Sequence, residues 1–228
     1  MSFRLSYRAD PGNPWFSWQY VRDNSDTILA ALRDHASLTA RAVLIAAVIA
    51  VPLAVAAYWF RPLAGPILAV TGVFYTIPSL ALFAFIAPYL GIGAITVLSV
   101  VVLYALLVIV RNSVAGLTQV PPEVREAAEG MGYGRWARLF RIDLPLALPG
   151  IITGLRLATV STVALVTVGV VVGRGGLGQL IFGGFQNNFF KAQIMTGTLL
   201  CVLLALVLDL ILAGIGRLLT PWLARRAS

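Results

Sequence analysis

Five apolar stretches dominate this chain, and each is close to the length that a helix needs to cross a lipid bilayer. A helical span takes about 20 mostly apolar residues to cover a hydrocarbon core roughly 30 Å thick. Of the 228 residues, 59% are hydrophobic and only 11% are charged, whereas soluble domains are about 45–50% apolar and about 25% charged. We therefore predict an all-α integral membrane protein with about five transmembrane helices. The predicted spans are residues 38–59, 63–87, 94–110, 151–172 and 192–219.

The polar residues divide the chain into three parts. Residues 1–36 are mixed in character and contain an aromatic cluster at residues 14–20, and aromatic side chains favour the membrane interface. We predict that this part is an arm lying on the membrane, and that His35, the only histidine, is surface-exposed. Residues 37–222 form the predicted transmembrane domain, and residues 223–228 form a short tail.

The longest polar segment between the spans runs from Pro121 to Pro149, and we call it the polar segment. It contains four of the nine acidic residues and four of the seventeen basic residues. Proline suits the first turn of a helix, so we predict a helix that starts at Pro121-Pro122 and ends at the glycines 130, 132 and 134. A second amphipathic helix follows, and the Leu-Pro pairs at 144–145 and 148–149 are expected to break it. Such helices suit either a groove on a partner or the lipid headgroups.

The polar segment also carries a long, regularly spaced pattern, EAA-x3-G-x9-I-x-L-P. This pattern resembles the EAA loop of ABC-importer permeases, which implies the MetI-like fold of type I importers with a cytoplasmic coupling loop at residues 121–149. The resemblance further implies that residues 126–132 form the coupling helix, which seats in a cleft of a separate ATPase. We predict that Gly132→Asp abolishes transport, because a branched acid would clash at the bend after this helix. The matching residues are Glu126, Ala127, Ala128, Gly132, Ile142, Leu144 and Pro145.

Other segments resemble the osmoprotectant branch of these permeases, which imports glycine betaine, choline, carnitine or proline betaine. Arg174 departs from that pattern, because a small residue is expected there. The alternative is a permease of the same class for another small solute, such as methionine or another amino acid. The segments that carry the resemblance are residues 74–82, 90–93, 175–178, 208–210 and 219–222.

The resemblance implies several partners. Two copies of the chain, or this chain and a related sister subunit, would enclose the pore in a prokaryotic plasma membrane. A pair of cytoplasmic ATPases would hold the ATP and Mg²⁺, and an external substrate-binding protein would deliver the solute. The chain itself lacks a G-x-x-x-x-G-K-[ST] loop, and its single cysteine, Cys201, provides no metal cluster. We therefore expect a transport subunit without catalytic residues, metal or cofactor of its own.

Arginine accounts for nearly all of the net charge of +8. In a membrane protein such an excess indicates orientation and lipid contact rather than a nucleic-acid partner. Because positive residues favour the cytoplasmic side, the loop after the third span is predicted to be cytoplasmic. Five spans then place the N-terminus outside and the tail, with Arg225 and Arg226, inside. The arginines of the loop are Arg111, Arg125, Arg135, Arg138 and Arg141.

Two groups of polar residues fall inside predicted spans, where polar residues are costly and often functional. Tyr75, Thr76, Pro78 and Ser79 interrupt the second span, so they either line a polar path or mark an ordinary proline kink. Asp209 and Arg156 lie in the fifth and fourth spans. They form either an ion pair between helices or part of a gate, or else they extend to the interface.

A glycine-rich turn follows the fourth span. Its sequence matches G-x-G-x-x-G, but no acidic residue stands about 20 positions further on, so a dinucleotide site is rejected. We predict an external turn in which Gly175, Gly176 and Gly178 permit positive φ angles. Lys191 and the polar residues 186–188 are expected to keep the rest of this loop in water.

Overall fold

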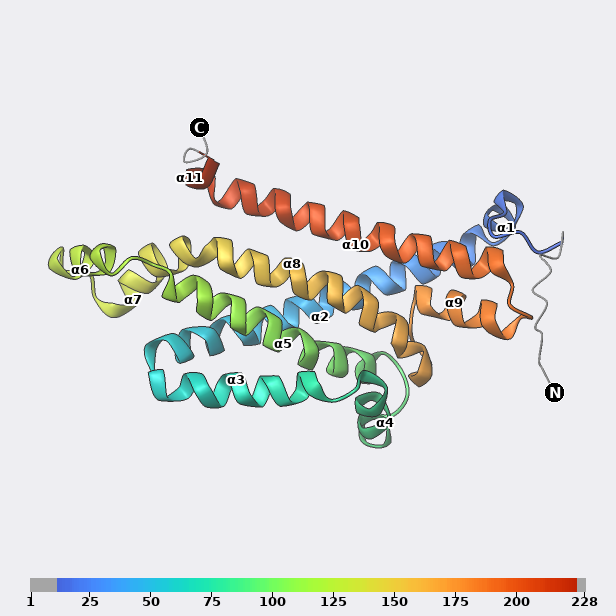
Figure 1. Ribbon diagram of the computed structural model, residues 1–228, viewed down its shortest axis with the longest axis horizontal. Helices are drawn as coiled ribbons and strands as arrows, with labels where there is room; N and C mark the ends of the chain where they lie inside the picture. The colour runs from blue at the N-terminus through green and yellow to red at the C-terminus, as the bar shows by residue number, and fades with distance from the viewer. Residues whose placement is uncertain (1–11, 225–228) are drawn as a thin grey trace, which may run out of the picture.

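The computed structural model describes residues 12–224, which fold into an elongated helical bundle with no strand among them (Figure 1). Residues 1–11 of the predicted arm and residues 225–228 of the predicted tail, including Arg225 and Arg226, lie outside the described range. The long helices are α2 (Ser25–Trp59), α5 (Ala94–Thr118), α8 (Leu144–Val168) and α10 (Lys191–Leu219). The shorter elements are α1 (Trp18–Asp23), α3 (Arg61–Thr76), α4 (Ser79–Leu90), α6 (Pro122–Gly130), α7 (Arg135–Arg138), the π-helix η1 (Leu139–Asp143), the 3-10 helix η2 (Gly169–Val172), α9 (Leu177–Gln186) and α11 (Pro221–Ala224).

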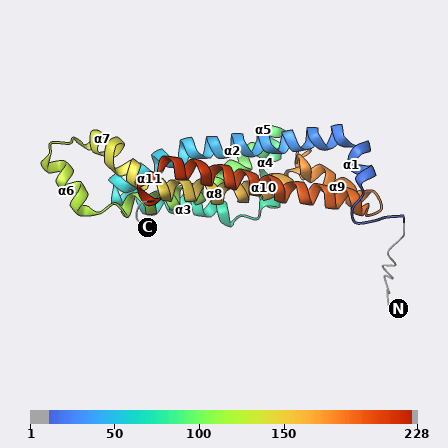
Figure 2. The ribbon, with the colours of Figure 1, turned by 90° about the horizontal axis from the view of Figure 1, so that it is seen from above.

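Helix α5 lies at the centre of the bundle. It packs against α2, α3, α4 and α8, and valine, leucine and isoleucine make most of its length apolar on every side. A helix that is apolar all round is a helix buried inside a protein or a membrane. Seen from above, the long helices run side by side along the long axis of the molecule (Figure 2).

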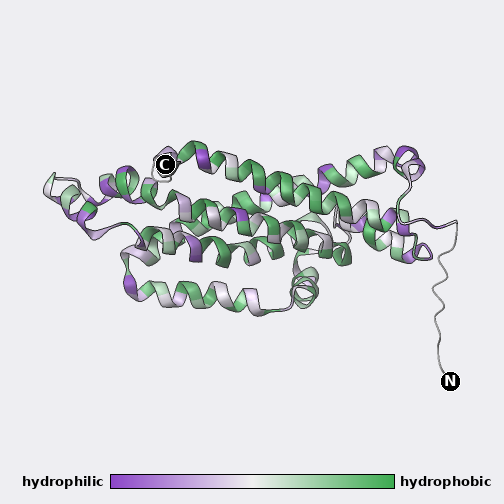
Figure 3. Ribbon diagram, turned by 45° about the horizontal axis from the view of Figure 1, so that its top comes forward, coloured by the Kyte–Doolittle hydropathy of each residue, from purple (hydrophilic) through white to green (hydrophobic). Residues whose placement is uncertain are grey.

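Four helical segments are long and apolar enough to cross a membrane: α2, α5, α10 and the continuous run from α7 to η2. Helices α3 and α4 pass the same test only when taken together, so the number of candidate spans is four or five. The prediction of an all-α membrane protein with about five spans is confirmed. Hydrophilic residues gather at the two ends of the long axis, around α6 and α7 and around α1 (Figure 3).

The second predicted span is not one kinked helix. Helices α3 and α4 meet at an angle of 96°, and Ile77 and Pro78 between them have extended ψ angles of 129° and 132°. Proline has no N–H to continue the helix, and it disfavours helical geometry in the residue before it. The reading of Pro78 as an ordinary kink is therefore wrong, because the chain leaves the helix completely for two residues.

The first long helix begins much earlier than predicted. Helix α2 starts at Ser25 rather than near residue 38, and it carries His35 into the bundle, where the imidazole is fully buried. The His35 Nε2–H donates to the Val163 carbonyl over 3.1 Å, and Nδ1 accepts from the Leu177 amide over 3.2 Å. The prediction of an exposed His35 is wrong, because its two ring nitrogens pair with backbone groups of α8 and α9.

Helices α5 and α8 approach each other so closely that only glycine fits at the contact. A Cβ atom on Gly150 would lie 2.8 Å from the Gly116 Cα and 3.1 Å from the Asn112 carbonyl oxygen. Small residues allow such close backbone contacts between membrane helices. This contact joins the central helix to the helix that follows the polar segment.

We predict that Gly150→Val lowers the free energy of unfolding by about 1–3 kcal/mol, because the added side chain overpacks this contact. Thermal unfolding of the purified chain measures the effect. The matched control is Gly214→Val, since no atom lies within 4 Å of a Cβ built at Gly214. Equal melting temperatures for the two variants would contradict the assigned contact.

Candidate functional site

The first half of the polar segment is a separate short helix, α6, at one end of the molecule (Figure 1). It starts at Pro122, with Glu123 in its first turn, and it ends at Gly130, so both predicted boundaries are confirmed. Backbone N–H groups that follow the helix donate hydrogen bonds to its last carbonyls. The Tyr133 amide donates to the Ala128 carbonyl over 3.0 Å, and the Gly132 amide donates to the Glu129 carbonyl over 2.9 Å. Gly132 makes this turn with a φ angle of +80°, a value that favours glycine.

Only one residue of the EAA triplet faces inward. Ala128 is fully buried, whereas Glu126 and Ala127 are exposed. Val124 and Met131 are also exposed, so α6 presents a partly apolar outer face that nothing in the described chain covers. No atom lies within 4 Å of a Cβ built at Gly132. The expected clash of a branched acid at this position is therefore wrong within this chain, and the constraint on Gly132 is its backbone angle.

The second half of the polar segment differs from the prediction, because its prolines do not break the helix. Helix α7 runs through η1 directly into α8, and Pro149 lies inside α8. In η1 the Leu144 amide donates to the Leu139 carbonyl, five residues back. This wider π-helical turn stands immediately before Pro145, which has no N–H to donate. The three EAA-pattern residues here, Ile142, Leu144 and Pro145, are partly buried.

A buried ionic cluster connects the two halves of the polar segment. The Asp143 carboxylate is completely buried, and it lies 3.7 Å from Arg125 Nε and 3.4 Å from Arg138 Nε. Arg138 also pairs with Glu129 of α6. Neither Asp143 oxygen has a hydrogen-bond partner among the described residues, so its interaction with the two guanidinium groups is ionic. We call Arg125, Arg138, Asp143 and Glu129 the charge cluster.

Arg125 extends this cluster to two long helices. Its Nη2 donates to the Leu117 carbonyl at the end of α5 over 2.7 Å, and its guanidinium lies 5.0 Å from the ring centre of Tyr58 in α2. One side chain of α6 therefore contacts the ends of α2 and α5, and through Asp143 it reaches the start of α8. Sequence reasoning missed this role, although an acid between Arg141 and an apolar run was a signal that Asp143 needed a partner.

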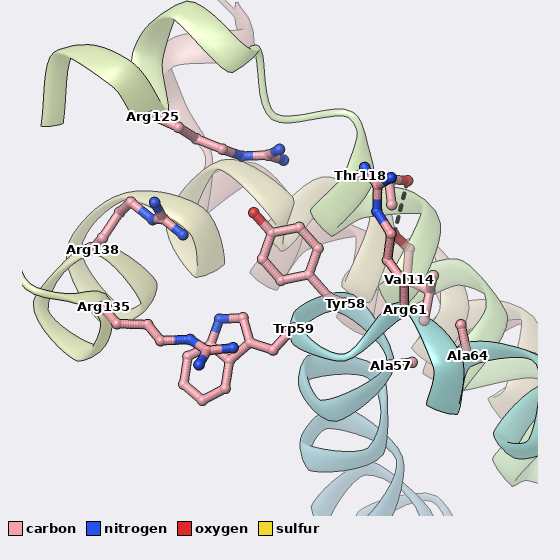
Figure 4. A pocket seen from close by; sticks show the side chains of 10 residues that line it. All are labelled: Ala57, Tyr58, Trp59, Arg61, Ala64, Val114, Thr118, Arg125, Arg135 and Arg138. Atoms are coloured by element: carbon pink, nitrogen blue, oxygen red, sulfur yellow. Dashed lines mark hydrogen bonds between the residues drawn. The ribbon is translucent and has the colours of Figure 1, made fainter. Parts of the chain in front are cut away.

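Beside the charge cluster lies a cavity of about 620 Å³, which we call the arginine pocket (Figure 4). Four arginines line it: Arg61, Arg125, Arg135 and Arg138. The guanidinium of Arg135 lies 4.4 Å from the Trp59 ring centre and 5.1 Å from that of Phe60. Aromatic faces attract guanidinium groups, so the end of α2 holds Arg135 in place.

The break between α3 and α4 lies beside Tyr104 of α5. The Tyr104 hydroxyl donates to the Ile77 carbonyl, so a backbone group that leaves the helix at Pro78 is paired. Tyr75 lies 5.7 Å from Tyr104 between ring centres, and both line a cavity of about 350 Å³ with Ser161 and Thr162 of α8. Of the predicted path residues, Tyr75 lines this cavity; Thr76, whose hydroxyl donates to the Val73 carbonyl, Pro78 and Ser79 do not.

The structure brings Arg156 and Asp209 together. Arg156 Nε donates to Oδ1 of Asp209 over 2.8 Å, and Nη2 donates to Oδ2 over 2.7 Å. This two-point geometry is the strong form of an arginine–carboxylate pair. It joins α8 to α10, which has few buried residues beyond its first two turns.

The glycine turn before α9 is packed rather than loose. Only Gly176 of the three predicted glycines has a positive φ, 51°, and a Cβ there would lie 2.6 Å from the Cβ of His35. Gly175 and Gly178 instead allow close contact with the backbone of Val170 and Thr167, so the prediction of positive φ at these two positions is wrong. Arg174, the residue that departs from the family pattern, pairs with Asp34 of α2 over 2.9 Å.

Lys191 is also not in water as predicted. It is nearly fully buried at the start of α10, and its Nζ lies 5.4 Å from the Trp15 ring centre. The Asn13 side chain donates to the Phe189 carbonyl and accepts from the Lys191 amide. Residues before α1 therefore cover the turn between α9 and α10, which no local sequence signal indicates.

Comparison with known proteins gives three findings. Residues 42–225 match the family described as binding-protein-dependent transport system inner membrane component. The chain is 38% identical to the osmoprotectant import permease protein OsmW of Salmonella typhimurium, over 89% of this chain and 96% of the relative. It is 35% identical to the glycine betaine/carnitine/choline transport system permease protein OpuCD of Bacillus subtilis, over 89% and 88% of the two chains.

The fold is also similar to solved structures. A chain of the MetNI methionine ABC transporter, in an inward-facing conformation, superposes with a TM-score of 0.79 over 90% of this chain and 100% of that chain. A second crystal form of the same transporter gives a TM-score of 0.77 over 87% and 98%. At 23% and 21% identity these likenesses concern the fold, and they confirm the MetI-like architecture.

We predict that Asp143→Asn loosens the polar segment, because Arg125 and Arg138 lose their shared counter-charge. The loss of stability should be about 2 kcal/mol, below the roughly 3–5 kcal/mol for fully buried pairs, since both guanidinium groups keep some contact with water. Limited chymotrypsin cleavage near Tyr133 and thermal unfolding measure the change. The control is Glu123→Gln, an exposed acid of the same helix; equal cleavage of the two variants would refute the cluster's role.

Proposed function

The chain belongs to the binding-protein-dependent transport system inner membrane component family, and we propose that it forms the membrane pore of an ATP-driven importer for a quaternary-ammonium osmoprotectant. Glycine betaine, choline and carnitine are the candidate solutes. The observation that carries this proposal is the set of similar permeases, 31–38% identical to this chain, whose names specify osmoprotectants of this kind. As a permease subunit, the chain hydrolyses no ATP itself.

We further propose that α6 is the docking element for a cytoplasmic ATPase dimer. The exposed Glu126 and Ala127, together with Val124 and Met131, offer the partner a short helix with a mixed apolar and acidic face. The charge cluster supplies a route from this helix into the bundle. A movement of α6 would act through Arg125 on the ends of α2 and α5, and through Asp143 on α8, as in a rigid-body transition between two states.

A second permease subunit, either a copy of this chain or a related chain, would complete the pore. Much of α3 and α10 carries exposed large apolar side chains, which suit lipid or a partner helix. The cavity lined by Tyr75 and Tyr104 is the candidate for the pore lining. The Arg156–Asp209 pair is the candidate for the gate. An external binding protein would deliver the solute at the opposite end of the bundle, near α9 and the Arg174–Asp34 pair.

The proposed orientation places α6 and the C-terminus in the cytoplasm and the N-terminus outside a bacterial inner membrane. The arginine-rich polar segment supports it, because positively charged loops favour the cytoplasmic side. Helices α6 and α11 also lie toward the same end of the long axis, while α1 and α9 lie at the other (Figure 1). Five spans, with the bent pair of α3 and α4 counted as one, also place the two termini on opposite sides of the membrane.

We predict that cells with the ATPase, the binding protein and this chain take up labelled glycine betaine at high osmolarity, and that cells lacking the chain do not. Labelled choline, carnitine and methionine are measured in parallel. Methionine uptake without betaine uptake would refute the osmoprotectant and favour the alternative solute class. If none of these solutes is transported while the chain still binds the ATPase, the proposed solutes are refuted and the docking proposal stands.

We also predict that Gly132→Val reduces uptake at least about tenfold, because a β-branched residue is strongly disfavoured at a φ of +80° and the turn after α6 must change. Gly134→Val is the matched control, since Gly134 has a φ of −67° and no atom lies within 4 Å of a Cβ built there. Both variants should reach the membrane at the wild-type level. Normal uptake by Gly132→Val would mean that this turn does not hold the docking helix in position.

A further inference from the structure

The arginine pocket carries more positive than negative charge. Four guanidinium groups line it, and none of the ten residues that line it is acidic. Glu129 and Asp143 pair with Arg125 and Arg138 from beside the pocket. Among residues 12–224, Arg61 and Arg135 have no ion-pair partner. The pocket therefore has two unneutralised positive charges at the junction between the bundle and the polar segment.

The four arginines line one cavity from different elements of the chain. Arg125, Arg135 and Arg138 enter it from the polar segment, and Arg61 enters from the start of α3 (Figure 4). The rings of Tyr58 and Trp59 lie between them and restrict Arg125 and Arg135. Arginine presents a rigid fork of N–H donors that matches the oxygens of a phosphate group. The chemistry of the pocket is thus that of a site for a phosphate group.

An apolar groove adjoins the arginine pocket, and the two share Trp59 as a wall. The groove has a volume of about 370 Å³, and no charged residue lines it. Trp59 meets Trp136 edge-on at 4.7 Å between ring centres, and Trp136 stacks on Phe140 at 6.1 Å. Trp136 and Phe140 are more than half exposed, so the groove is open along the side of the molecule. Val51 and Val55 of α2 also line the groove.

We propose that an anionic phospholipid binds across these two sites, with its phosphate group in the arginine pocket and an acyl chain in the apolar groove. A ligand with a charged head and an apolar tail matches a cationic pocket that adjoins an apolar groove at Trp59, whereas a free phosphate would leave the groove empty. Zwitterionic lipids carry a cation next to the phosphate, which the surplus of arginines repels. In the proposed orientation the site faces the cytoplasmic leaflet, where anionic lipids attract basic segments.

The bound lipid would act as a clamp on the polar segment. Three of the four arginines belong to α6 and α7, while Trp59 and Arg61 belong to α2 and α3. A phosphate group between them would hold the docking helix against the bundle. This inference does not depend on the transported solute, so it can fail while the proposed function stands.

Native mass spectrometry of the full chain in detergent, titrated with phosphatidylglycerol or with phosphatidylcholine, tests the proposal. The pocket variant is Arg61→Gln with Arg135→Gln, which leaves the charge cluster intact. Its matched control is Arg111→Gln with Arg141→Gln, which removes the same charge from two exposed arginines outside the pocket. We expect the pocket variant to bind phosphatidylglycerol roughly tenfold more weakly than the wild type. The control should stay within about twofold, and phosphatidylcholine should bind all three proteins equally weakly.

A variant of the groove keeps the test independent of the arginines. Phe140→Gln should weaken binding of long-chain phosphatidylglycerol while leaving the short-chain dihexanoyl form unaffected. Equal phosphatidylglycerol binding by wild type and pocket variant would overturn the proposal, and so would an equal loss in the control pair. Displacement of the lipid by millimolar inorganic phosphate would assign the pocket to a soluble anion. Displacement by the ATPase would assign it to the protein interface.

Discussion

Backbone polar groups inside an apolar bundle must be paired within the protein, because lipid offers them no hydrogen bonds. This requirement explains the irregular parts of the structure as well as the long helices. At the break between α3 and α4, the Tyr104 hydroxyl donates a hydrogen bond to the Ile77 carbonyl. At the start of α9, His35 accepts from the Leu177 amide, which the first turn of the helix leaves without a partner. At both of these departures from regular helix, a side chain from another helix pairs the backbone group.

The same requirement shapes the polar segment. The chain passes Pro145 and Pro149 without leaving the helix. A π-helical turn precedes Pro145, which lies at the start of α8, and Pro149 lies inside α8. As a result, α7, η1 and α8 form one continuous rod that leads into the bundle from the end of the molecule that carries α6. A broken helix would have left α7 on a hinge, whereas the rod connects it directly to the bundle.

Electrostatics then joins α6 to this rod. The buried Asp143 carboxylate would be costly alone, and Arg125 and Arg138 balance it from two sides. Because Arg125 also contacts Leu117 and Tyr58, one small ionic cluster links α6 to the ends of three long helices. Arg61 and Arg135, which have no ion-pair partner among residues 12–224, line the arginine pocket together with Arg125 and Arg138. The charge cluster and the proposed lipid site therefore share two arginines.

The sequence by itself determined the membrane class, the approximate number of spans and the start and end of α6. These features follow from composition, from runs of apolar residues and from proline and glycine at helix ends, all of which act over a few neighbouring residues. The long EAA-type spacing likewise identified the polar segment before any contact was known. The ion pair of Arg156 with Asp209 was foreseeable as one of few pairings, because charges inside spans need partners.

Only the tertiary structure decided the burial of His35 and Lys191, the 96° turn at Pro78 and the tight packing of Gly175 and Gly178. The burial of His35 depends on contacts far along the chain, such as the one with Leu177. Gly178 packs against Thr167 across a turn. Pro78 by itself predicts an interruption of the helix, but the angle between α3 and α4 is set by the packing of the two helices. The arginine pocket is of the same kind, since it combines α2, α3, α5 and the polar segment. Local patterns specify which segments are helices, but helix packing decides which side chains meet.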